Sequence, residues 1–70
     1  MIKEGAEVTI IPSGRLEEMK LSGLTGIRGM VTEDLSYKER KNKGCMICLN
    51  APYLEGYTWF IPIESIKANE

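Results

Sequence analysis

Glycine and proline interrupt this sequence so often that it predicts many tight turns and leaves no room for a long helix. Seven glycines and three prolines occur within 70 residues, and both residue types are typical of turns and of the ends of secondary-structure elements. Residues 15–21 have the composition for one helical turn, but a segment this short does not form a stable helix by itself. We therefore expect many short elements joined by tight turns, and no α-helix longer than two turns.

Three segments between these turns have the composition of β-strands. Residues 6–10 alternate apolar and polar side chains, which is typical of a half-buried strand. Residues 44–50 are nearly continuous in apolar residues, and residues 57–61 are rich in aromatic and β-branched residues. Both compositions favour strands, and turn residues at Pro52 and Gly56 separate the two segments.

Two further strands follow from the positions of glycine and proline. The glycines within residues 23–29 suit a bend or bulge where the backbone approaches its neighbour closely, and they lead into a strand that ends near Glu33. Pro62 lacks the N–H group for a ladder hydrogen bond, so it ends the fourth strand or lies at an edge. Residues 63–67 then leave room for a single turn and a last short strand.

Five short strands predict one all-β domain over residues 1–70, a small barrel or sandwich. We expect a long loop over residues 12–24 and one 3₁₀ turn near residues 62–65. The residues expected in the core are the inward-facing apolar residues of these strands: Val8, Ile10, Ile27, Val31, Ile47, Leu49, Ile61 and Ile66.

The residue types that the chain lacks exclude several classes of enzyme. There is no histidine, which removes the commonest general base and the commonest metal ligand. Asp34 is the only aspartate, and the adjacent acidic pairs point in different directions and do not converge on one substrate atom. We expect no catalytic residues and no cofactor. The apolar runs are too short for a membrane span and the N-terminus does not resemble a secretory signal, so we expect a cytoplasmic protein.

Two segments resemble known β-barrels. Ile61-Pro62-Ile63-Glu64-Ser65-Ile66 resembles the ending of SH3-like barrels, in which a proline follows an apolar strand residue, a 3₁₀ turn comes next and an apolar residue returns to the core. Gly26-Ile27-Arg28-Gly29-Met30-Val31 is similar to the glycine-spaced strand of KOW-type barrels, which share this broad fold. The resemblance implies a small five-stranded SH3-like barrel that works as an interaction module.

The resemblance does not extend to the known binding residues of these families. Peptide-binding SH3 domains carry an aromatic-rich first strand, paired tryptophans and a tyrosine in the closing turn. Here the first strand holds Val8 and Ile10, Trp59 is the only tryptophan, and Ser65 occupies the closing turn. Pro62 is the one groove residue that matches. KOW-type barrels are often strongly basic, whereas this chain has a net charge of −1.

Cys45 and Cys48 form a Cys-x-x-Cys pair that does not predict a metal or redox site. Structural zinc requires four ligands, and this chain supplies two cysteines and no histidine. Residues three apart in a strand face opposite sides and lie roughly 10 Å apart, too far for a disulfide. We expect two reduced cysteines, at least one of them buried as a small hydrophobic residue. The alternative is a zinc ion shared between two chains.

Residues 38–43 contain the main cluster of basic side chains, with four positive charges and one negative charge. Such a cluster at a hairpin tip contacts phosphates or only solvates the tip and discourages edge pairing. A neighbouring tyrosine is available to stack on a base. The candidate nucleic-acid-binding residues are Tyr37, Lys38, Arg40, Lys41 and Lys43.

The aromatic residues near the C-terminus are the candidate protein-binding surface. Alternation along residues 57–61 directs Trp59 inward and Phe60 outward if Ile61 is in the core. Phe60 beside Tyr53 would then be a docking patch. In the alternative, the loop over residues 15–24 covers these rings with Leu16, Met19 and Leu24 and completes a thin core.

These observations predict a non-enzymatic interaction module that binds another protein through Tyr53, Phe60 and Trp59. Binding of nucleic acid through the basic residues is the alternative function. We expect no membrane partner, and a monomer or weak homo-oligomer.

Overall fold

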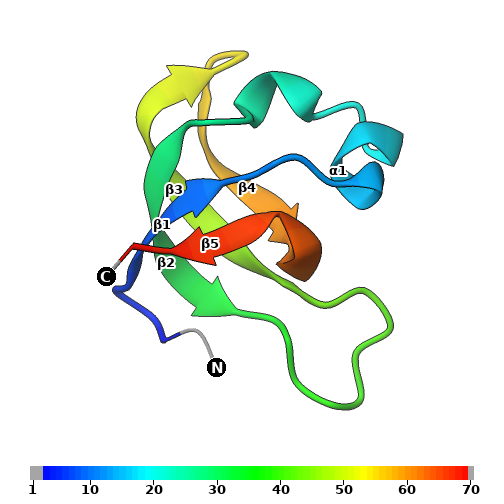
Figure 1. The fold of residues 1–70 in the computed structure, drawn as a ribbon. Coiled ribbons are helices and arrows are strands. Elements are labelled where there is room, and N and C mark those ends of the chain that lie inside the picture. The colour runs from blue at the N-terminus through cyan, green and yellow to red at the C-terminus, as the bar shows by residue number, and fades with distance from the viewer. Residues whose placement is uncertain (1–2, 70) are drawn as a thin grey trace.

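The computed structural model describes residues 3–69, in which five antiparallel strands form one sheet with one short helix and two 3₁₀ turns (Figure 1). The prediction of a small all-β fold with five short strands and no long helix is confirmed. The elements in chain order are β1 (Glu7–Ile10), α1 (Gly14–Glu18), η1 (Ser22–Leu24), β2 (Arg28–Asp34), β3 (Gly44–Tyr53), β4 (Gly56–Pro62), η2 (Ile63–Ser65) and β5 (Ile66–Ala68).

The strands lie in the order β4-β3-β2-β1-β5, so each strand pairs with its neighbour in sequence except β5, which pairs with β1. The sheet is open and is not a closed barrel, which corrects that part of the prediction. β5 has only three residues, all of them paired with β1. The other outer strand, β4, is covered in part by α1, which packs against β4 and η2.

The core lies on one face of the sheet and under the loop that carries α1. Six of the eight predicted core residues are buried, whereas Ile27 and Ile66 are only partly buried and pack at its margin. The loop contributes Leu16 and Leu24, and β3 contributes Cys45. The buried apolar side chains are Val8, Ile10, Leu16, Leu24, Val31, Cys45, Ile47, Leu49 and Ile61.

Serine hydroxyls fix the loop of residues 12–24 against the end of the sheet. The hydroxyl of Ser13 caps α1, because its Oγ accepts a hydrogen bond from the N–H of Leu16 at 3.1 Å. The same Oγ lies 2.5 Å from Oγ of Ser65, which is fully buried in η2. η2 is the 3₁₀ turn that the sequence predicted near residues 62–65. These contacts hold α1 beside the C-terminal end of β4.

Close backbone approach explains one of the predicted glycine positions in β2. A Cβ atom on Gly29 would lie 2.6 Å from the backbone oxygen of Cys48, so only glycine fits at this point, where β2 pairs closely with β3. A bulge follows in the same strand between Val31 and Glu33.

The β3–β4 hairpin is tighter than the sequence predicts. β3 runs through Pro52 to Tyr53, which pairs with Gly56. Leu54 and Glu55 form the two-residue turn, and both have positive φ, at 50° and 68°. The positive φ values match the turn type that suits the twist of a two-residue hairpin, although neither residue is the glycine or asparagine that usually occupies it.

Candidate functional site: a basic pocket beside Phe60

The basic residues predicted from the sequence lie in the loop between β2 and β3, here called the basic loop (residues 36–43). The backbone groups of Leu35 and Gly44 hydrogen-bond to one another and close its base. The N–H of Arg40 donates to the carbonyl of Tyr37 at 3.1 Å, which forms a turn within the loop. The side chain of Tyr37 is 53% exposed. The loop therefore presents its charges and one aromatic ring to solvent.

Cationic groups in the basic loop donate to neutral oxygens of the loop itself. Nζ of Lys43 donates to the carbonyl of Arg40 at 3.0 Å and to that of Lys38 at 3.5 Å. Nε of Arg40 donates to the carbonyl of Asn42 at 2.8 Å. These bonds order the loop but do not neutralise its charge, so the charge is available to an external anion.

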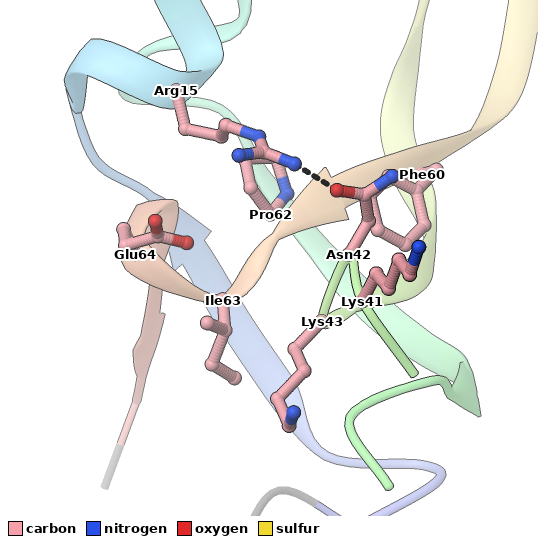
Figure 2. Close-up of a pocket in the computed structure, with 8 residues that line it drawn as sticks. All are labelled: Arg15, Lys41, Asn42, Lys43, Phe60, Pro62, Ile63 and Glu64. Carbon is pink, nitrogen blue, oxygen red and sulfur yellow. Dashed lines mark hydrogen bonds between the residues drawn. The ribbon is translucent and has the colours of Figure 1, made fainter. Parts of the chain in front are cut away.

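Arg15 joins this cluster from a distant part of the chain, and the sequence analysis did not identify it. It lies in α1, and its Nη2 donates to Oδ1 of Asn42, 27 residues away (Figure 2). No local sequence signal marks Arg15, because its position depends on how the loop of residues 12–24 packs on η2. We call Arg15, Lys38, Arg40, Lys41 and Lys43 the basic cluster.

Phe60 lies on the outward side of β4, beside the basic loop. Its ring packs over Gly44, where a Cβ atom would come within 2.8 Å of the ring. The guanidinium carbon of Arg40 lies 5.5 Å from the ring centroid, within the range of a cation–π interaction. The ring of Phe60 therefore contacts the basic loop and not the other aromatic rings, those of Tyr53 and Trp59.

Tyr53 and Trp59 pack on each other and against the core. Their ring centroids are 5.8 Å apart in an edge-to-face arrangement, and Nε1 of Trp59 donates to the carbonyl of Gly56 at 3.0 Å. Gly23 lies against Tyr53, since a Cβ there would be 2.5 Å from its hydroxyl oxygen. The structure thus covers Tyr53 with the loop and does not bring the three aromatic candidates, Tyr53, Trp59 and Phe60, onto one surface.

A pocket of about 200 Å³ opens between α1, the basic loop and η2 (Figure 2). It combines cationic groups with an apolar wall, and Glu64 adds one carboxylate. Around it the basic cluster gathers five of the nine basic residues of a chain whose net charge is −1. The pocket is lined by Arg15, Lys41, Asn42, Lys43, Phe60, Pro62, Ile63 and Glu64. The basic loop and the pocket lining are positive although the whole chain is not, and they can hold an anion.

The two cysteines are free and point to opposite faces of β3. Cys45 is fully buried, which confirms the prediction that at least one is a core residue, and Cys48 is half-buried. Burial, and then the neighbouring Asp34 carboxylate, raise the pKa of the Cys45 thiol, so it is protonated and unreactive at neutral pH. Hydrogen bonds from Ser36 lower the pKa of Asp34. Within residues 3–69 no three potential metal-ligating side chains lie together.

Alanine substitution of the two cysteines is expected to change the free energy of unfolding by different amounts and to have no other effect. Cys45→Ala removes a buried sulfur and should lower the free energy of unfolding by about 1–2 kcal/mol, whereas Cys48→Ala should change it by less than about 0.5 kcal/mol. Urea unfolding followed by Trp59 fluorescence measures both values. The double variant should keep the oligomeric state and metal content of the original chain. Stoichiometric zinc that the double substitution releases would instead support a metal site shared between chains.

No helix among residues 3–69 is long and apolar enough to cross a membrane. No family model, curated protein or solved structure matches the chain. Its function is therefore inferred from the basic pocket and the surface around it.

Proposed function

We propose that the chain is a small, non-enzymatic SH3-like module that binds single-stranded nucleic acid through the basic loop and Phe60. One observation carries the proposal: four cationic side chains, those of Arg15, Arg40, Lys41 and Lys43, lie beside the ring of Phe60, and the hydrogen bonds of Arg15, Arg40 and Lys43 go to neutral oxygens. Cations with neutral partners attract phosphates, and an aromatic ring beside them supports a base.

The strand arrangement supports the SH3-like part of the proposal. β1 pairs with both β2 and β5, and a 3₁₀ turn separates β4 from β5. The turn follows Pro62, as in the motif that resembles the closing turn of these barrels. Because one fold serves many functions, this likeness supports the architecture and does not select the ligand.

The charge distribution favours nucleic acid over a neutral protein surface. The basic loop and the pocket lining together hold the five basic residues of the cluster and two acidic residues, Glu39 and Glu64, while α1 adds the exposed Glu17 and Glu18 close to Arg15 in sequence. The loop and the pocket lining therefore keep a positive charge. Tyr37 is half-exposed at the start of the loop and supplies a second ring for stacking. The net charge of −1 provides no wide positive field, so binding should be modest in affinity and sensitive to salt.

Protein binding through Tyr53, Trp59 and Phe60, the first expectation from the sequence, has less support. Tyr53 and Trp59 pack against the core, and Phe60 lies on the other face of β4 beside Arg40. Of the large hydrophobic side chains that are exposed, Tyr37 lies in the basic loop, and Met30, Leu54 and Tyr57 lie outside both the loop and the pocket.

Two matched quadruple variants test the proposal. Lys38, Arg40, Lys41 and Lys43 are changed to glutamine in one variant, and Lys3, Lys20, Arg28 and Lys67 in the control, so both change the net charge from −1 to −5. Fluorescence anisotropy with a labelled oligothymidine measures affinity at several salt concentrations. We expect the loop variant to lose about a hundredfold in affinity. For the original chain, a plot of log affinity against log salt concentration should have a slope of about −3.

The control variant should bind within about fivefold of the original chain, since none of its four charges belongs to the basic loop or lines the pocket. Both variants should stay folded, because none of the changed side chains belongs to the buried core. Equal losses in the two variants, or an original chain that does not bind oligothymidine, would overturn the proposed function.

A further inference from the structure

The pocket between α1, the basic loop and η2 has a shape and lining that suit a defined binding position and not only general attraction of anions. We propose that it is a subsite for one phosphodiester group of the bound strand, with Arg15 and Lys41 as its cationic ligands. The inference rests on the proposed function and deepens it, because it assigns a defined phosphate position and adds Arg15, a residue outside the basic loop.

Arg15 is held in position before any ligand binds. The Ser13 cap and the contact between Ser13 and Ser65 fix the start of α1, and the bond to Asn42 fixes the guanidinium over the pocket. A guanidinium has five N–H donors in a planar fork, and one of them bonds to Asn42. The remaining donors can give two parallel hydrogen bonds to phosphate oxygens.

Size and lining argue for one phosphodiester rather than a whole ligand. The volume of about 200 Å³ is below the roughly 300–1,000 Å³ of pockets that enclose complete small molecules. A phosphate and part of its sugar are the right scale, and Ile63 supplies an apolar wall for the sugar in the same pocket as the Phe60 ring (Figure 2).

Glu64 lowers the positive charge of the pocket lining without reversing it. Its carboxylate lines the same space as Arg15, Lys41 and Lys43, so the cations still outnumber it and the pocket attracts an anion. A free phosphate meets this lining alone, whereas a phosphodiester within a strand is also held by the contacts of its neighbouring phosphates with the basic loop. A phosphate within a strand should therefore bind more tightly than free phosphate.

Two single substitutions with equal charge change test the subsite. Arg15→Gln removes the fork over the pocket, and Arg28→Gln removes an exposed arginine from β2. With labelled oligothymidine we expect Arg15→Gln to weaken binding about tenfold or more, because the charge-assisted hydrogen bonds to the phosphate are lost. Arg28→Gln should weaken binding by less than about twofold, because only long-range charge changes. Arg15→Lys should give an intermediate loss, since it keeps the charge but not the fork.

Amide NMR spectra of the original chain provide an independent readout. Oligothymidine should shift the resonances of Arg15, Asn42 and Ile63, which surround the pocket, and inorganic phosphate at the same concentration should not. Free phosphate that shifts these resonances as strongly would overturn the diester assignment. The spectrum of each variant also shows that it is folded.

The outcomes separate the two proposals. If oligothymidine binds and the loop quadruple variant abolishes binding, but Arg15→Gln and Arg28→Gln lose equally, the subsite is wrong and the proposed function stands. If the original chain does not bind oligothymidine, both fail. A larger loss in Arg15→Gln with shifted pocket resonances supports the subsite.

Discussion

Replacing Gly44 with alanine is expected to remove most of the stability of the protein. The added Cβ would lie 2.2 Å from the backbone oxygen of Ile61 and 2.8 Å from the ring of Phe60. The oxygen belongs to the paired strand β4, so relief requires the two strands to move apart. We expect a loss of about 3 kcal/mol or more in the free energy of unfolding, close to the total of about 3–5 kcal/mol that a core of this size supplies.

Gly14→Ala is the matched control for this substitution. A Cβ on Gly14 would meet no atom within 4 Å, and Gly14 is the first residue of α1. Alanine is a better helix former than glycine, so the control should leave stability unchanged or raise it by up to about 1 kcal/mol. Far-ultraviolet circular dichroism with urea unfolding measures both variants. A Gly44→Ala protein as stable as the Gly14→Ala protein would contradict the packing of β3 against β4.

Ile47→Ala should have a comparable effect through a cavity rather than a clash. Ile47 is fully buried in β3, opposite Val31 on one neighbouring strand and Trp59 on the other. Removal of a buried isoleucine typically lowers the free energy of unfolding by about 2–5 kcal/mol, because the surroundings do not close the space. We expect a cooperative transition at much lower urea, or no folded baseline, when Trp59 fluorescence is followed.

The adjacent Met46 provides the control for Ile47. It lies on the outward face of β3 and is only half-buried. Met46→Ala should lower stability by less than about 1.5 kcal/mol, since the side chain keeps partial access to water in the folded state. If Met46→Ala costs as much as Ile47→Ala, the assignment of the inner face of β3 is wrong.

Local sequence chemistry accounts for much of the fold. Alternation in residues 6–10 predicted β1, and Pro62 with the residues after it predicted η2. Gly29 is needed where the backbones of the paired strands β2 and β3 approach closely, as the glycine spacing indicated. These features depend on steric limits of single residues and on the two-residue period of a strand, both of which are visible in a linear sequence.

Long-range packing decided between alternatives that the sequence left open. Leu16 and Leu24 are fully buried, in agreement with the alternative in which the loop over residues 15–24 completes the core, whereas Ile27 and Ile66, expected in the core, are only partly buried. The sheet stays open because β5 is short and pairs with β1 alone. Neither outcome follows from residue types, since each depends on which surface a segment covers.

The candidate site divides in the same way. The sequence by itself determined the basic loop, because its charges are neighbours along the chain, and it determined by strand alternation that Phe60 faces outward. Only the tertiary structure brought Arg15 to Asn42 and Phe60 to Arg40, since those contacts join segments about 20 or more residues apart. Such contacts form only after β3, β4 and α1 have packed, so their positions are a property of the folded chain.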